Sequence, residues 1–221
     1  MSDYLVHMTH ADLATGRQNL LSIIRQGRVN HSLAPTGTCR NVPGVPSQYT
    51  TSFSEIPMGY LDRLIERHGR YGVGFRRTAV IDAGGSPVWY LPPTSPAQRV
   101  FQEAYFRGRG GDIDYQDPIW QCSPFIDNPA NGGSWRFEWQ WEREWRVLGP
   151  FDFDAASVAL IFAPEDDHGQ LDAEISYQLT GDCEGWWGES IFIDPHWSIE
   201  VIQQVIPKTG RVLPDGPAAG L

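Results

Sequence analysis

The amino-acid sequence predicts a single α+β domain built around a mixed or antiparallel central sheet. The chain has 221 residues, near the upper end of what one domain holds, and 41% of them are hydrophobic, which supplies a sizeable core. Helical patterns come early in the chain and strand patterns dominate late. Strands and helices do not alternate regularly, as they would in a parallel α/β sheet.

The first quarter of the chain predicts a strand, a helix, a loop and a second strand. Residues 4–8 (YLVHM) form the first predicted strand. The apolar residues of 20–24 are helically spaced, and the helix they predict stops at Gly27. Prolines and glycines within residues 33–48 predict a loop. Residues 49–54, rich in Thr, Tyr and Phe, predict the next strand.

The middle of the chain alternates between helices and short strands. Pro57 begins a predicted helix that ends at Gly69. Residues 72–75 and 87–91 predict two strands around the Gly84-Gly85 turn, and residues 97–106 predict a helix.

The remaining elements follow a long predicted loop over residues 108–133, rich in Gly and Pro. Loops of that length inside a domain are often functional lids. Residues 143–148 alternate as a strand, and residues 158–162 are apolar enough to form a buried strand. We expect one domain over residues 1–207 and a flexible tail over residues 208–221.

Composition excludes several classes of protein. The net charge of −10 argues against stable binding to nucleic acid, which requires a basic surface. Three widely spaced cysteines predict reduced thiols rather than a disulfide framework or a zinc site. The sequence lacks a signal-peptide pattern and a long apolar stretch, so we expect a cytoplasmic protein with no membrane segment.

Three short segments carry candidate functional residues. His7 and Thr9 lie at the end of the first strand, where they could contact a ribose hydroxyl, although a half-buried histidine bonded to the backbone is the simpler explanation of His7. Ser52 and Ser54 share one face of their strand, where they either line a cleft or bond to neighbouring residues. We find no His, Cys, Asp and Glu spacing typical of a metal site.

The most informative segment is Trp141-Glu142-Arg143-Glu144-Trp145-Arg146-Val147. In a regular strand Glu142 and Glu144 lie on one face. Two neighbouring carboxylates raise each other's pKa, which suits one of them to acid–base or hydrogen-bonding work. The alternative is an edge strand whose exposed carboxylates pair with Arg143 and Arg146.

The order of these segments resembles the AbiG-type abortive-infection family of bacterial phage-defence proteins. The resemblance covers residues 4 to 148 and rests on six segments: LVHMT at 5–9, LLSIIRQG at 20–27, SFSEIP at 52–57, RYGVGF at 70–75, PVWY at 87–90 and WEREWR at 141–146.

The opening strand, His-x-Thr and Gly-terminated helix are also similar to those of DNA-modifying ADP-ribosyltransferase toxins. That resemblance implies an ADP-ribosyltransferase-like fold with NAD as co-substrate and no metal. Carried over by order, His7 and Thr9 would hold NAD, and Ser52 or Ser54 with Tyr71 (or Tyr90) would support its nicotinamide side. Glu144 would be catalytic by stabilising the oxocarbenium charge, and Glu142 would position the acceptor, a nucleic acid or a protein.

The AbiG-type resemblance also implies a second reading. Members of that family have been labelled antitoxins, so the chain could instead be a non-enzymatic component that binds a cognate toxin. Its negative charge suits a basic partner as well as it suits a solvated enzyme.

Overall fold

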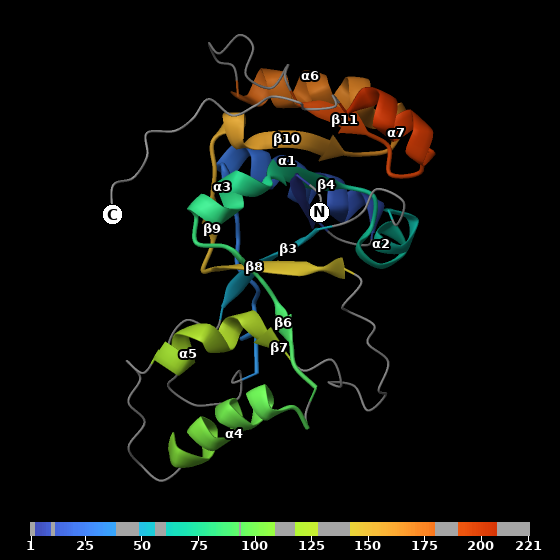
Figure 1. Cartoon of the computed structure of the whole chain (residues 1–221). Helices are drawn as coiled ribbons and strands as arrows, with labels where there is room; N and C mark the ends of the chain where they lie inside the picture. The colour runs from blue at the N-terminus through green and yellow to red at the C-terminus, as the bar shows by residue number, and fades with distance from the viewer. Residues whose placement is uncertain are drawn as a thin grey trace, which may run out of the picture.

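The computed structural model describes residues 3–9, 12–38, 49–55, 61–92, 94–108, 118–127, 142–179 and 190–206. Its centre is a seven-stranded sheet with the strand order β11-β10-β4-β1-β3-β8-β5 (Figure 1). The sheet consists of β1 (Tyr4–Met8), β3 (Thr50–Ser54), β4 (Gly72–Arg76), β5 (Ser86–Pro87), β8 (Glu144–Leu148), β10 (Val158–Phe162) and β11 (Ile191–Ile193).

Two short ribbons accompany this sheet. One pairs β2 (Arg28–Val29) with β9 (Phe151–Asp152), and the other pairs β6 (Trp89–Tyr90) with β7 (Ile126–Asp127). The described α-helices are α1 (Leu13–Gln26), α2 (Leu61–His68), α3 (Arg77–Asp82), α4 (Pro96–Gly108), α5 (Pro118–Cys122), α6 (His168–Leu179) and α7 (Ile199–Val205). Short 3-10 turns are η2 (Ser123–Phe125), η4 (Ala155–Ser157) and η5 (Glu165–Asp167).

The sheet is mostly antiparallel, which confirms the predicted mixed α+β class. Among its described pairs, β10 with β11 is parallel and the others are antiparallel. A parallel pair needs a crossover, and α6 lies between these two strands in the chain. The expectation that helices come early and strands late was therefore wrong, because α6 and α7 lie in the last quarter of the chain.

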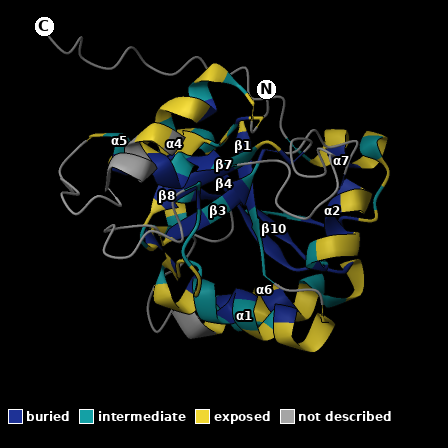
Figure 2. Cartoon of the chain, turned by 90° about the horizontal axis from the view of Figure 1, so that it is seen from below, coloured by how far each residue is buried: buried dark blue, intermediate teal, exposed yellow. Residues whose placement is uncertain are grey.

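Both faces of the sheet are covered, because alternate residues of each strand point to opposite sides. Figure 2 shows the buried strands between helices whose outer surfaces are exposed. One core packs α1, α3 and α6 on the sheet, and its fully buried members include Leu5, Leu20, Phe53, Val73, Phe75, Val80, Ile161 and Leu171. The other packs α2 and α7 on the opposite side, with Val6, Leu61, Leu64, Leu160, Phe162, Ile193 and Ile202.

The sheet is joined weakly at one place. β1 and β4 pair at five positions, and so do β3 and β8. In contrast, β1 and β3 pair at the single position Val6↔Ser54. The strands β11, β10, β4 and β1 (the β4 side) are thus connected to β3, β8 and β5 (the β8 side) through one bridged pair of residues.

The segment expected to be a loop over residues 108–133 contains regular structure. Residues 118–127 form α5, η2 and β7, and β7 pairs with β6. The buried Trp120 and Ile126 anchor these short elements, which is why they form despite the surrounding Gly and Pro residues. The single strand predicted over residues 87–91 was wrong in its extent. Two short strands stand there, β5 in the large sheet and β6 in the small ribbon.

Other expectations fall partly or wholly outside the described residues. The tail 208–221 lies there, as do Pro57, the 39–48 part of the predicted loop, Cys39 and Cys183. Cys122 is an exposed free thiol. Within the described residues, no helix combines the length and the apolar character that crossing a bilayer demands.

Candidate functional site

A pocket of about 460 Å³ opens where β1 and β3 diverge. Strands β1, β3 and β8 form its floor, and the last turn of α2 and the β6–β7 ribbon contribute to its sides. Its lining residues are Val6, His7, Met8, Ser52, Phe53, Ser54, Arg67, His68, Tyr90, Asp127, Glu142, Glu144 and Arg146. The structure therefore brings together the predicted site residues His7, Ser52, Ser54, Glu142 and Glu144, and also Tyr90, the predicted alternative to Tyr71.

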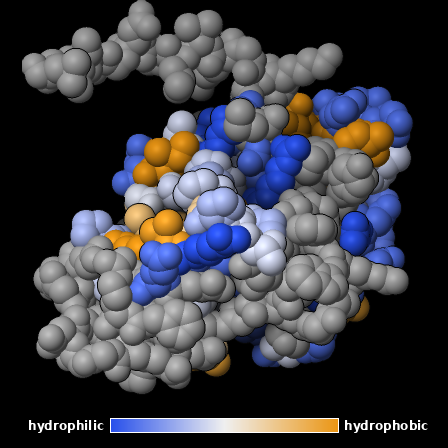
Figure 3. Space-filling model, turned by 60° about the horizontal axis from the view of Figure 1, so that its bottom comes forward, coloured by the Kyte–Doolittle hydropathy of each residue, from blue (hydrophilic) through white to orange (hydrophobic). Residues whose placement is uncertain are grey.

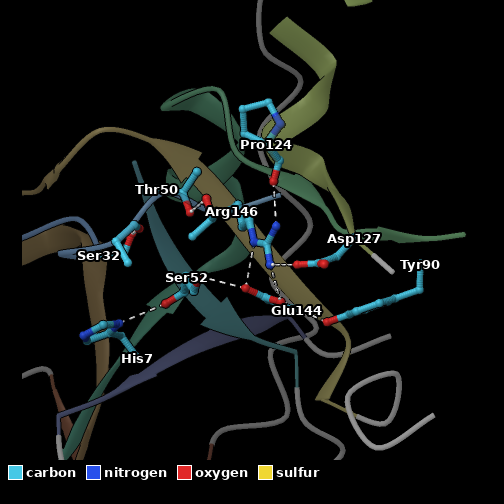
Figure 4. A network of polar contacts seen from close by, with 11 residues as sticks. His7, Ser32, Thr50, Ser52, Tyr90, Pro124, Asp127, Glu144 and Arg146 are labelled. Atoms are coloured by element: carbon cyan, nitrogen blue, oxygen red, sulfur yellow. Dashed lines mark hydrogen bonds and ion pairs between the residues drawn. The ribbon is translucent and has the colours of Figure 1, made fainter. Parts of the chain in front are cut away.

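Glu144 lies at the centre of a hydrogen-bond network on one side of the pocket (Figure 4). Its Oε1 accepts hydrogen bonds from the Ser52 hydroxyl (2.8 Å) and from Nε of Arg146 (2.8 Å). Its Oε2 accepts from the Tyr90 hydroxyl (2.9 Å) and from Nη2 of Arg146 (3.0 Å). An ionised carboxylate can accept about four hydrogen bonds. Side chains of the protein therefore already fill the acceptor positions of Glu144.

Arg146 is the cation of this network, and its side chain is only 5% exposed. Beyond its two bonds to Glu144, it donates from Nη2 to Asp127 (2.9 Å) and from Nη1 to the carbonyl of Pro124 (2.6 Å). Burial lowers the pKa of its guanidinium, but the charges and hydrogen bonds of Glu144 and Asp127 outweigh burial and raise that pKa overall. A buried arginine with several satisfied donors fixes the geometry around it.

The Arg146 network also attaches the β6–β7 ribbon to the large sheet. Tyr90 comes from β6, Asp127 from β7, and Pro124 from η2. Burial raises the pKa of the Tyr90 hydroxyl, and the neighbouring Glu144 adds to this effect. Tyr90 therefore remains a neutral hydrogen-bond donor throughout the physiological range.

Glu142 does not share a strand with Glu144, contrary to the prediction. It precedes β8, and Arg143 between the two glutamates has a φ of 44°, in the left-handed region that side chains other than Gly seldom adopt. Regular alternation thus ends at Arg143. Glu142 still reaches the pocket, where its Oε1 accepts from Nη1 of Arg67 (3.1 Å) and lies 3.5 Å from Nε2 of His68.

His7 lies at the edge of the pocket, with its ring against Phe53 at a centroid distance of 6.1 Å. Its Nδ1 donates to the backbone carbonyl of Ser52 (2.9 Å), which assigns the ring hydrogen to Nδ1 and leaves Nε2 as an acceptor in the neutral ring. Burial lowers the pKa of His7; the bond to Ser52 opposes this, and nearby His68 adds to it. The neutral form is favoured at pH 7.

Thr9 and Tyr71 do not reach the pocket. The Thr9 hydroxyl lies 2.7 Å from the carbonyl of Gly16 and 3.1 Å from that of Tyr71, tying β1 to α1 and to the start of β4. The Tyr71 hydroxyl donates to Asp167 (2.9 Å). Burial and this carboxylate raise the pKa of Tyr71 to about 12. Both residues join structural elements where the prediction had placed contacts to NAD.

Sequence reasoning overlooked several pocket residues. Arg146 had been expected only as an ion-pair partner on an exposed edge strand; it does pair with Glu144, but both side chains are largely buried in the pocket wall. Asp127 lay in the segment taken for a loop. Arg67 and His68 end α2 and carry no local signal for the site.

Among the described residues, no group of three or more His, Cys, Asp or Glu side chains is arranged to hold a metal ion.

Comparison with known protein families gives one match. Residues 38–168, more than half of the chain, match the family model described as abortive phage resistance protein AbiGi, antitoxin. The chain belongs to the AbiGi family. No curated protein and no solved structure matches it.

The AbiGi match confirms the predicted phage-defence family and covers most of the pocket. Ser52, Tyr90, Asp127 and Glu144 lie inside the matched segment, whereas His7 lies before it. The similarity to ADP-ribosyltransferase toxins stays a prediction, and so does a role for NAD.

Proposed function

We propose that this AbiGi-family chain is an antitoxin, which neutralises a cognate toxin by binding it and catalyses no reaction. The observation that carries this proposal is the match over residues 38–168 to a family described as an antitoxin of abortive phage resistance. The net charge of −10 agrees with it, because an acidic surface attracts a basic partner and speeds its association.

The geometry of Glu144 supports a binding role over catalysis. A catalytic carboxylate in an ADP-ribosyltransferase must accept a hydrogen bond from the substrate ribose and face its developing positive charge. Glu144 already accepts four hydrogen bonds from Ser52, Tyr90 and Arg146. Binding NAD through Glu144 would require at least one of these bonds to break.

A second candidate function is an NAD-dependent ADP-ribosyltransferase that modifies a nucleic acid or a protein. One observation favours it: His7, Ser52, Ser54 and Glu144, which the resemblance had connected by order alone, line a single pocket. The saturated carboxylate of Glu144 argues against it.

Expression in bacterial cells separates the two functions. An antitoxin expressed alone leaves growth unchanged and consumes no NAD, and it restores growth when its cognate toxin is expressed beside it. A transferase toxin expressed alone arrests growth and consumes NAD, and Glu144→Gln abolishes both effects. Growth arrest that depends on Glu144 would contradict the antitoxin proposal.

Glu66→Gln provides the matched control for that experiment. Glu66 is exposed on α2, outside the pocket lining, so its substitution removes the same charge without altering the network around Glu144.

A further inference from the structure

The ionisable side chains of the pocket give it a negative charge. Three carboxylates line it (Asp127, Glu142 and Glu144), against two guanidinium groups (Arg67 and Arg146). Counting these carboxylates and guanidinium groups alone, the formal charge of the lining is −1. An anionic ligand such as a phosphate ester would meet unfavourable charge here.

The two arginines do not make the pocket attractive to an anionic ligand, because both donate hydrogen bonds to acceptors of the protein. Arg146 directs its donors into the wall, to Glu144, Asp127 and the Pro124 carbonyl. Arg67 donates to Glu142 at the pocket edge. The end of α2, which supplies Arg67 and His68, carries the partial negative charge of a helix C-terminus.

Glu142 supplies an available acceptor. The residue is 7% exposed, and Oε1 is the oxygen that contacts Arg67 and His68. Within the part of the chain that the structure describes, no hydrogen bond to Oε2 or to the Ser54 hydroxyl is found, although both residues line the pocket. The buried side-chain atoms that lack a partner among the described residues include no atom of Glu142, so a donor entering the pocket can reach its second oxygen, and a charged donor binds a carboxylate most strongly.

We propose that the pocket binds a cationic nitrogen group, an alkylammonium or a guanidinium, with Glu142 as its counter-ion and the Ser54 hydroxyl as a further acceptor. A volume of about 460 Å³ accommodates a lysine or arginine side chain. Under the proposed antitoxin function, on which this assignment of the source rests, the cation is a side chain of the toxin. A free small cation would satisfy the same chemistry.

Side-chain analogues test the pocket chemistry directly. Propylguanidine and butylamine are titrated into the full chain by isothermal calorimetry, with NAD as the anionic probe. We expect the two cations to bind and NAD not to bind. Glu142→Gln should weaken cation binding by about tenfold or more, the effect of losing one charge-assisted hydrogen bond. Glu66→Gln should bind as the wild type does.

Circular dichroism verifies that Glu142→Gln is folded, and Ser54→Ala provides a second variant with a smaller loss. Failure of both cations to bind, equal binding by Glu142→Gln and wild type, or binding of NAD in this pocket would overturn the proposal.

Competition identifies the source of the cation. The toxin is captured on the immobilised chain with and without propylguanidine in excess. We expect the analogue to displace the toxin, and undiminished capture would overturn the assignment to a toxin side chain. Cation binding that depends on Glu142, in a chain that fails to neutralise the toxin, would refute the antitoxin function and leave the pocket chemistry standing.

Discussion

At the scale of single residues, Arg146 and its carboxylate partners dominate the candidate site. Arg146 bridges β8 to β7 through Asp127 and to η2 through the Pro124 carbonyl, and it also bonds Glu144 on its own strand. Removing one member of a buried ion pair leaves the other charge uncompensated, which costs far more than the pair itself contributes. Arg146 is therefore the side chain on which the shape of the pocket wall depends.

Arg146→Met should lower the free energy of unfolding by about 3–5 kcal/mol, the cost typical of breaking a buried ion pair. Urea denaturation measures this loss. The control is Arg28→Met, because the Arg28–Asp152 pair is largely exposed and its loss should leave the midpoint nearly unchanged. Equal midpoints for the two variants would contradict the role of Arg146.

His7 makes stability depend on pH. Its folded pKa is lowered from 6.5, mainly by burial, so the unfolded chain binds a proton more readily than the folded chain does. The free energy of unfolding should therefore fall as the pH falls below 6.5. Denaturation of wild type and His7→Asn between pH 7.5 and 5 tests this, and the variant should lose less stability. If the exposed His31→Asn flattened the curve as much as His7→Asn, the effect would not belong to His7.

At the scale of elements, one carboxylate connects the ends of three neighbouring strands. Asp194 follows β11 and accepts from Arg70, just before β4, and from the backbone of Glu165, just after β10. The backbone of His196 donates to it as well. Burial acts to raise the pKa of Asp194, but these donors and the charge of Arg70 outweigh burial and lower it.

Asp194 should stabilise the fold only while it is ionised. Its folded pKa lies below the ordinary value of 3.8, so its contribution is complete above that pH and is lost as the pH falls through the folded pKa. Asp194→Asn should therefore be less stable than wild type at pH 6, and the difference should shrink below about pH 4. Asp62→Asn, at an 87% exposed side chain, should show no such convergence.

Local patterns predicted the strands that carry the sheet, and long-range contacts decided the elements that were missed. The strands at 4–8 and 158–162 are rich in apolar, β-branched or aromatic residues, so local sequence was enough to predict them. In α6, Leu171 and Ile175 are its buried apolar residues among those whose burial is described, too few to signal a helix. The hydrogen bonds of Glu144 with Tyr90 and of Arg146 with Asp127 join distant segments, which periodicity does not reveal.

At the scale of the whole molecule, the large exposed apolar side chains of the described residues are scattered. On the face in Figure 3, the hydrophobic side chains form separate small groups among hydrophilic ones. Large exposed apolar residues such as Leu33, Trp89 and Tyr177 lie far apart in the sequence. With a net charge of −10, the molecule is better suited to electrostatic attraction of a partner than to a broad apolar interface.

Under the proposed antitoxin function, association with the toxin should therefore slow as salt is added. Raising NaCl from 0.05 to about 0.5 M shortens the Debye length several-fold and should reduce the association rate by about tenfold or more, with a smaller change in the dissociation rate. Stopped-flow mixing of the two proteins measures both rates. An association rate independent of salt would show that the acidic surface does not guide the encounter.

The single Val6↔Ser54 bridge between β1 and β3 has a consequence for hydrogen exchange. Amide protons of β4 and β10, which lie inside the β4 side, should exchange only through global unfolding. Those of β3 and β8 can exchange through a lesser opening, which breaks one ladder position, the His7–Ser52 hydrogen bond and the packing of Phe53 on Phe75 in the shared core. The pocket lies across that seam, so a ligand bound there would hold the two sides together and slow exchange in β3 and β8 first.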